Sequence, residues 1–323
     1  MAERTRIEWC DHTWSPWEGC TKVSPACDHC YAEARNQRFA KGANWGPGAP
    51  RRRTVDWSKP LAWDKAAARA GRRDSVFPSL CDPFDNEVDL SWRDDLFALI
   101  GQTPNLDWLL LTKRIGNAGN MLPVPFDFDR LYPNVWLGAT ICNQAEADRD
   151  IPKLLALPAS VRFLSIEPML GPIDLSPWLW GCETPCADCP QDADCVCGFT
   201  TRRELGLPSI GWVICGGESG PHARPMHPDW VRSLEQQCRG VGTAFFMKQW
   251  GEWMPIGQQA HGDGPGCSDF PGYAAAQRCV LQRDGEVCGE WPPGAMLMRR
   301  VGKKAAGRLL DGRTHDEFPG DHR

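Results

Sequence analysis

Short apolar runs alternate with helical stretches along most of the first 250 residues. The apolar runs have the length of strands and occupy residues 12–18, 75–81, 106–112, 134–140, 161–166, 211–215 and 243–247. The helical stretches between them occupy residues 31–41, 92–101, 144–157 and 229–240. Continuous apolar strands that alternate with helices are typical of parallel βαβ units covered on both faces. The pattern therefore predicts an α/β protein built as a partial (β/α) barrel.

Two intervals are too long for a simple crossover between strands, which indicates insertions at loops. Residues 42–74 contain Gly-Pro-Gly and a run of three arginines, Arg51 to Arg53. Residues 174–210 are rich in cysteine. We accordingly place the barrel in residues 1–255 and a C-terminal extension with a basic tail in residues 256–323.

Three cysteines, Cys20, Cys27 and Cys30, lie between the first predicted strand and the first predicted helix. Catalytic sites of α/β barrels are built at this carboxyl end of the strands. A four-iron four-sulfur cluster held by only three thiolates keeps one iron open to a small chelating ligand. A structural zinc site completed by His29 or His12, and thiols that bind no metal, are the alternatives.

A second group of cysteines lies in the interval 174–210. Its members are Cys182, Cys186, Cys189, Cys195 and Cys197. Almost no apolar residue separates them, so packing cannot order this segment and a metal is the expected organiser. A zinc knuckle, an auxiliary iron-sulfur cluster and a metal-free segment all remain open.

Residues able to bind a nucleoside amino acid follow the predicted strands. They are Asp82, Lys113, Glu167, Gly216, Gly217 and Glu218, and Lys248 is a further candidate. Carboxylates suit ribose hydroxyls, cations suit a carboxylate, and glycine permits close backbone approach. The same residues are also common in strand-end turns, at helix caps and on solvated surfaces.

Composition limits the function classes. The chain has 323 residues, is 42% apolar and carries a formal net charge of -5, so it can bury a full barrel core and has no global attraction for a polyanion. Sixteen cysteines without an N-terminal apolar segment favour a reduced, cytoplasmic compartment. The sequence contains no run of about 20 apolar residues, so it predicts no membrane span. The motifs of serine hydrolases, P-loop nucleotidases and zinc peptidases are absent from the sequence.

Five segments together resemble a phage-associated radical S-adenosylmethionine (SAM) family of undefined activity, distantly similar to spore photoproduct lyase. They are Gly-Cys-Thr-Lys-Val-Ser-Pro-Ala-Cys-Asp-His-Cys-Tyr-Ala-Glu at 19–33, Leu-Leu-Leu-Thr-Lys-Arg at 109–114, Ser-Ile-Glu-Pro-Met-Leu-Gly-Pro-Ile at 165–173, Cys-Gly-Gly-Glu-Ser-Gly-Pro at 215–221 and Phe-Met-Lys-Gln-Trp-Gly at 246–251. The likeness spans residues 6–255, with a similar tail near residues 302–319. The first cysteine gap has six residues, where the usual radical SAM loop has three.

The resemblance implies a partial barrel of the radical SAM type, a reducible 4Fe-4S cluster on Cys20, Cys27 and Cys30, and a 5'-deoxyadenosyl radical. It implies that Glu167 lies near the ribose or sulfonium of SAM, Lys113 near its carboxylate and residues 216–218 near its adenosyl portion. A reductase or flavodoxin-type protein would supply the electron.

The candidate substrate is a nucleic acid or nucleotide, for a lyase, modification or repair reaction. The basic tail from Arg299 to Arg313, Arg51 to Arg53 and exposed tryptophans could bind phosphates and bases. The rival hypothesis is a non-catalytic, zinc-stabilised nucleic-acid-binding protein.

Overall fold

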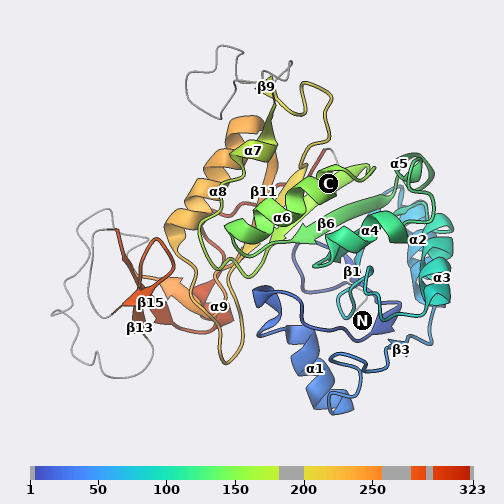
Figure 1. The fold of residues 1–323 in the computed structure, drawn as a ribbon, viewed down its shortest axis with the longest axis horizontal. Helices are drawn as coiled ribbons and strands as arrows, with labels where there is room; N and C mark the ends of the chain where they lie inside the picture. Colours follow the sequence, from blue (N-terminus) through green and yellow to red (C-terminus); the bar gives the residue numbers. More distant parts are fainter. Residues whose placement is uncertain (1–3, 182–199, 257–277, 289–293, 321–323) are drawn as a thin grey trace. The chain divides into compact units, whose positions relative to one another are not determined.

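The computed structural model describes residues 4–181, 200–256, 278–288 and 294–320 (Figure 1). The chain forms two compact units. Unit 1 comprises residues 1–140, 149–165 and 319–323, and unit 2 comprises residues 141–148 and 166–318. The boundary at residue 255 stays a prediction.

The main sheet has seven strands in the order β1-β4-β5-β6-β7-β10-β11. These strands are β1 (His12–Thr13), β4 (Asp74–Phe77), β5 (Leu106–Thr112), β6 (Val135–Thr140), β7 (Val161–Ile166), β10 (Trp212–Gly216) and β11 (Ala244–Gln249). Helices alternate with them along the chain, which confirms the predicted α/β class.

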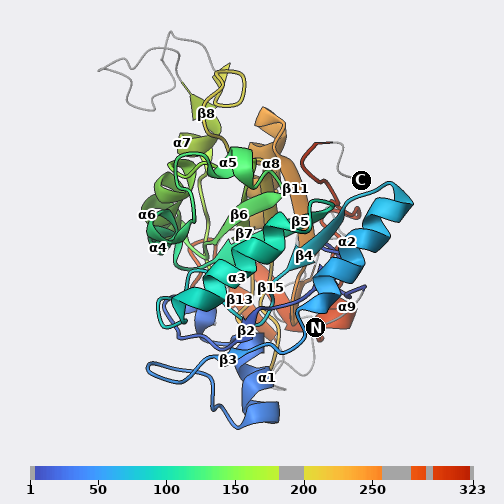
Figure 2. The same ribbon diagram turned by 90° about the vertical axis from the view of Figure 1, so that its right-hand side faces the viewer.

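In unit 1, β1, β4, β5, β6 and β7 pair in that order, and every pair is parallel. All six residues of β6 are buried, as are six of the seven in β5, as expected for strands covered on both faces. The other elements are β2 (Trp17–Glu18), η1 (Pro25–Cys27), α1 (Tyr31–Ala40), β3 (Arg52–Arg53), α2 (Ser58–Ala70), α3 (Leu90–Gly101), α4 (Ile115–Met121), α5 (Phe128–Leu131) and α6 (Gln144–Leu155). Helix α2 packs against β4 and β5 (Figure 2).

The strand predicted over residues 12–18 is interrupted. Residues 12–13 form β1 of the main sheet, whereas residues 17–18 form β2, which pairs antiparallel with β3. The break falls at Ser15 and Pro16. The Ser15 hydroxyl replaces a backbone partner by accepting from Leu80 N–H at 2.9 Å, and Pro16 has no N–H to continue a ladder. The prediction of one continuous strand was therefore wrong here.

The interval 42–74 is not only an inserted loop, because it contains the 13-residue helix α2 before β4. This helix is rich in alanine, the best helix former. It ends at Gly71, whose φ of +64° is the left-handed conformation typical of a helix C-cap. The helix was not predicted, because the Gly and Pro residues before it made the whole interval look like a loop.

In unit 2, β10 and β11 are parallel neighbours, and α8 (Pro228–Val241) packs against β11. The C-terminal part adds an antiparallel sheet of order β12-β15-β13-β14. The remaining elements are α7 (Ser176–Leu179), β8 (Trp180–Gly181), β9 (Thr200–Thr201), β12 (Trp253–Pro255), β13 (Arg278–Leu281), β14 (Val287–Cys288), β15 (Met296–Arg300) and α9 (Lys303–Ala306). The helices predicted over 31–41, 92–101, 144–157 and 229–240 are confirmed as α1, α3, α6 and α8.

A membrane-crossing helix is not found among the described residues, since none of their helices is both long and apolar enough. The seven-strand order, with parallel pairing in each unit, is consistent with a partial barrel. In parallel strands the carboxyl ends share one edge of the sheet, so in unit 1 the segments after β4 and β5 meet there.

Candidate functional site

The backbone at Cys20 is held in place by glycine geometry and by hydrogen bonds from two directions. Gly19 has a φ of +124°, and a Cβ there would lie 2.4 Å from the carbonyl oxygen of Asn44. The Gly19 N–H donates to the carbonyl of Leu80 at 3.2 Å, and the Cys20 carbonyl accepts from Gly46 N–H at 2.9 Å. The loop is therefore fixed on both sides of its first cysteine.

Cys27 and Cys30 lie at the other end of the same loop. Cys27 is the last residue of η1, a short turn in which the hydroxyl of Ser24 accepts from the N–H of Ala26 at 3.0 Å. Cys30 directly precedes α1, where the helix dipole favours negative charge. Cys27 is buried, whereas Cys20 and Cys30 are partly exposed. The structure thus places all three thiols between β2 and α1, as the sequence predicts.

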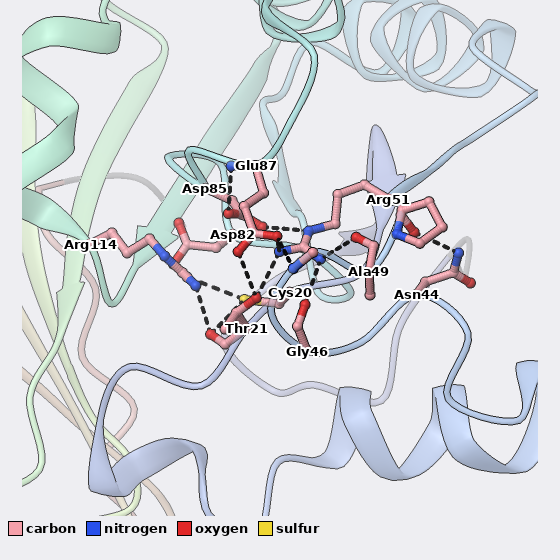
Figure 3. Close-up of polar contacts among 12 residues, drawn as sticks. Cys20, Thr21, Asn44, Gly46, Ala49, Arg51, Asp82, Asp85, Glu87 and Arg114 are labelled. Carbon is pink, nitrogen blue, oxygen red and sulfur yellow. Dashed lines mark hydrogen bonds and ion pairs between the residues drawn. The ribbon is translucent and has the colours of Figure 1, made fainter.

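Arg114, which follows β5, donates a hydrogen bond to the sulfur of Cys20 (Figure 3). Its Nη1 lies 3.2 Å from Cys20 Sγ and 3.0 Å from Oδ2 of Asp82. Its Nη2 donates to the carbonyl of Thr21 at 2.6 Å. The side chains of Arg114 and Asp82 are each only 7% exposed. The guanidinium therefore links the cysteine loop to the carboxyl edge of the sheet.

Asp82 is itself held by its neighbours. Its Oδ1 accepts from the Thr112 hydroxyl at 2.6 Å and from the Phe84 N–H at 3.0 Å. Its Oδ2 accepts from the Lys113 N–H at 3.1 Å, in addition to Arg114. Asp82 therefore has a structural role, because both of its carboxylate oxygens already accept hydrogen bonds.

The electrostatics of this pair affect the thiol. Burial raises the pKa of Cys20 to about 11, with Asp82 acting in the same direction and Arg114 opposing both. Burial by itself lowers the pKa of Arg114, but Asp82 and Cys20 outweigh it and raise that pKa. Cys20 is therefore protonated at neutral pH, and a metal ion that bound there would have to displace this proton.

A second buried ion pair supports the loop. Arg51 Nε donates to Asp85 Oδ2 at 2.7 Å, with 1% and 0% of the two side chains exposed. Its Nη2 also donates to the Thr21 hydroxyl at 2.8 Å (Figure 3). Arg52 pairs with Glu18. The prediction that Arg51 to Arg53 form a phosphate-binding patch is therefore wrong for Arg51, which is buried and paired.

The three thiols are donors that either an iron-sulfur cluster or a zinc ion would accept. Cys20, Cys27 and Cys30 are all free thiols on one short loop, and the sulfur of Cys20 already accepts a charge-assisted hydrogen bond. Across the described ranges, no group of three His, Cys, Asp or Glu side chains is arranged to hold a metal ion. The three cysteines therefore match such a site in the type of donor atom and in their position on the loop.

His12 is engaged elsewhere. Its Nε2 lies 3.3 Å from Asp74 Oδ2, its Nδ1 lies 3.4 Å from the Arg4 N–H, and its ring stacks on Trp63 with centroids 4.3 Å apart. Both ring nitrogens have partners, which removes His12 as the fourth ligand of a zinc site. Of the two candidates for that ligand, His29 remains.

Lys113 lies at the carboxyl end of β5, between Thr112 and Arg114, with its side chain partly exposed. Unlike Arg114, its ammonium group makes no hydrogen bond or ion pair with any residue in the described ranges. A carboxylate at this edge of unit 1 would find one cation available.

Unit 2 contains a separate polar cluster at the ends of its strands. Glu167 Oε2 lies 2.8 Å from Nζ of Lys248, and Glu167 Oε1 accepts from Nε2 of Gln249 at 3.0 Å. The buried Oε1 of Gln249 has no hydrogen-bond partner among the described residues. A Cβ at Gly216 would lie 3.3 Å from the Glu167 carboxyl carbon, so glycine leaves room beside that carboxylate. The structure thus joins Glu167, Gly216 and Lys248 in one place.

Gly217 and Glu218 are accounted for by the fold. A Cβ at Gly217 would lie 2.0 Å from the carbonyl oxygen of Trp250, so close backbone packing requires glycine there. Glu218 is 6% exposed and forms a bidentate pair with Arg224, with Oε1 to Nη2 at 2.6 Å and Oε2 to Nε at 2.9 Å. Close backbone packing therefore explains the glycine at position 217, and the ion pair with Arg224 explains the glutamate at position 218.

Two predicted regions give different outcomes. The second cysteine group, Cys182, Cys186, Cys189, Cys195 and Cys197, lies outside the described residues.

In the basic tail, Arg308 pairs with Asp316 and Arg313 with Glu235. The exposed side chains of Arg299, Lys303 and Lys304 have no partner within the described ranges. The tail therefore presents fewer available cations than its sequence indicates.

The sequence pattern did not identify three residues that shape these sites. Arg114 stood out only as the last residue of the segment 109–114, although its side chain contacts Cys20, 94 positions away. Asp85 and Gln249 had no distinguishing signal beyond their place after apolar strands. Such long-range contacts have no local sequence signature.

Comparison with known proteins gives one match. The family described as "Protein of unknown function (DUF5131)" matches residues 4–319. No curated protein and no solved structure matches the chain. Because the match covers nearly the whole sequence, this chain belongs to the DUF5131 family.

Proposed function

We propose that this protein is a radical SAM enzyme in which Cys20, Cys27 and Cys30 hold a 4Fe-4S cluster. The observation that carries the proposal is the loop itself. Three free thiols lie between β2 and α1, and a buried cation donates to the sulfur of Cys20. The residue motifs that resemble the radical SAM family add the reaction class. The partial barrel is then of the radical SAM type.

The 4Fe-4S cluster would supply the electron for reductive cleavage of the sulfonium carbon-sulfur bond of SAM, and so start hydrogen abstraction from a substrate. The residues of this chain bind and orient. Cys20, Cys27 and Cys30 would hold the cluster to which SAM binds. Lys113, whose ammonium group is available, is assigned to the SAM carboxylate.

The resemblance also assigns Glu167 and Gly216 to the nucleoside. Glu167 is already oriented by Lys248 and Gln249, and Gly216 leaves space beside its carboxylate. Asp82 and Glu218 are assigned supporting roles, since each is saturated by an arginine and backbone donors. Gly217 lets the chain pass close to Trp250.

We further propose an external reductase or flavodoxin-type donor, and a nucleic acid or nucleotide as substrate. The support for the substrate is limited to the exposed cations Arg299, Lys303 and Lys304 and to the distant likeness to spore photoproduct lyase. The five cysteines from Cys182 to Cys197 are proposed to bind zinc or an auxiliary cluster.

The test is anaerobic reconstitution with iron and sulfide, followed by electron paramagnetic resonance (EPR) of the reduced protein. Wild type is expected to bind about four iron ions per chain and to show a reduced-cluster signal that shifts when SAM is added. Cys27→Ala should lose both the iron and the signal. An auxiliary cluster on Cys182 to Cys197 would add iron of its own, so the SAM-dependent shift is the decisive readout.

Cys81→Ser is the matched control, because Cys81 lies beside this loop but outside the three-cysteine pattern. It should retain the SAM-responsive signal. Stoichiometric zinc with no cluster signal in wild type would contradict the proposal. That result would favour the non-catalytic, zinc-stabilised nucleic-acid-binding protein.

A further inference from the structure

We propose that Arg114 is a positioning residue that sets the reduction potential of the cluster through its hydrogen bond to the Cys20 sulfur. This inference rests on the proposed function, because it requires Cys20 to be a cluster ligand. The contact itself is observed: Nη1 of Arg114 lies 3.2 Å from Cys20 Sγ.

The guanidinium is fixed in direction. Asp82 accepts from the same Nη1 at 3.0 Å, and the Thr21 carbonyl accepts from Nη2 at 2.6 Å. Asp82 is anchored in turn by the Thr112 hydroxyl and the Lys113 N–H. With only 7% of the Arg114 side chain exposed, solvent screens its charge weakly. The cation is thus held against the sulfur rather than free to turn toward solvent.

Hydrogen bonds to ligating sulfurs and the burial of the site are two of the factors that set iron-sulfur potentials. A cation that donates to the thiolate withdraws electron density from it and stabilises the reduced cluster, which carries one more negative charge. Asp82 offsets part of this charge, but the group in hydrogen-bond contact with the sulfur is the guanidinium. Arg114 should therefore make the cluster easier to reduce.

A purely structural role is the competing explanation, because Arg114 also ties the Thr21 carbonyl to the sheet edge. The two roles differ in what they predict. A structural role affects stability and metal content, whereas a tuning role shifts the midpoint potential of a cluster that is fully loaded.

The experiment is an anaerobic redox titration of reconstituted wild type and the variants Arg114→Met, Arg114→Lys and Arg114→Gln, followed by EPR. Dithionite supplies one electron per cluster, and no bond forms or breaks. Lysine keeps the charge, glutamine keeps an N–H donor, and methionine removes both. We expect Arg114→Met to have a more negative midpoint potential than wild type at equal iron content, with the other two variants between them.

Arg52→Met is the charge-matched control, because Arg52 is 63% exposed and pairs with Glu18 instead of a cysteine. It should leave the potential unchanged. Wild-type potentials in all loaded Arg114 variants would overturn the inference. So would failure of all three to load iron while wild type and Arg52→Met load it, since that would make Arg114 structural. A wild type without any cluster signal would instead overturn the proposed function.

Discussion

At Gly19 the backbone adopts a φ of +124°, and a Cβ at this residue would lie only 2.4 Å from the Asn44 carbonyl oxygen. Gly46, on the segment that hydrogen-bonds to Cys20, has a similar φ of +109°, but a Cβ there would meet nothing within 4 Å. The two positions therefore separate the effect of backbone strain from that of steric overlap. Of the two, only Gly19 combines both effects directly beside a predicted cluster ligand.

We expect Gly19→Ala to lower the free energy of unfolding by about 4 kcal/mol, the sum of φ strain and overpacking. Gly46→Ala should lower it by about 2 kcal/mol, because only the strain applies. Chemical denaturation of the two variants and wild type measures the difference. Equal losses in both variants would show that the Asn44 segment moves aside without cost.

At the scale of the element, side-chain capping determines where helix α8 begins. Helix α8 starts at Pro228, and the imidazole of His227 caps it, because Nδ1 of His227 accepts from the Asp229 N–H at 3.1 Å. Its Nε2 lies 3.1 Å from the Gly294 carbonyl, so the ring donates there in the neutral form. The side chain is fully buried. A protonated ring would lose the capping acceptor.

This cap should make the stability of the protein depend on pH. Burial lowers the pKa of His227 below its ordinary value of 6.5, although Asp229 acts in the opposite direction. The unfolded chain therefore binds more protons than the folded protein below pH 6.5, and the free energy of unfolding falls as the pH drops. The contribution is at most about 1.4 kcal/mol per pH unit.

His227→Asn is the informative variant, because asparagine is a good N-cap that does not titrate. Urea titrations between about pH 7 and pH 5, the range in which histidine changes charge, should show a smaller pH dependence in this variant than in wild type. His315, whose pKa is also lowered by burial, contributes with the same sign and stays present in both proteins. Identical pH dependence in the two proteins would rule out His227 as the source.

At the scale of the whole molecule, charge limits how a polyanion could bind, because several cations among the described residues already have partners. The formal net charge is -5, and three of the six cations in the tail, Arg300, Arg308 and Arg313, have carboxylate or carbonyl partners. Arg299, Lys303 and Lys304 are the exceptions within the tail's described residues. Binding to a single strand through this region would therefore involve about three phosphates and depend modestly on salt.

We expect the double variant Lys303→Ala/Lys304→Ala to reduce the slope of log K against log salt by about 1.4 for a single-stranded oligonucleotide. Fluorescence anisotropy at several salt concentrations measures this slope. Lys59→Ala/Lys65→Ala, on α2, removes the same charge elsewhere and should leave the slope unchanged. An equal reduction in both variants would show that binding is not localised to α9.

The sequence by itself determined the elements and the chemistry that each could carry. Apolar runs predicted β5, β6 and β7, and the helical stretch predicted over 229–240 corresponds to α8, because these signals act between residues close together in the chain. It also placed three thiols between a strand and a helix.

Only the tertiary structure decided which charged groups are available. It paired Arg51 with Asp85 and Arg114 with Cys20, left the ammonium group of Lys113 without a partner within the described ranges, and paired Glu218 with Arg224. Each pair joins segments whose apposition depends on strand order and burial, and a charged side chain looks the same in the sequence whether it is buried or solvated. The physical reason is that desolvation and partner distance are properties of the folded chain.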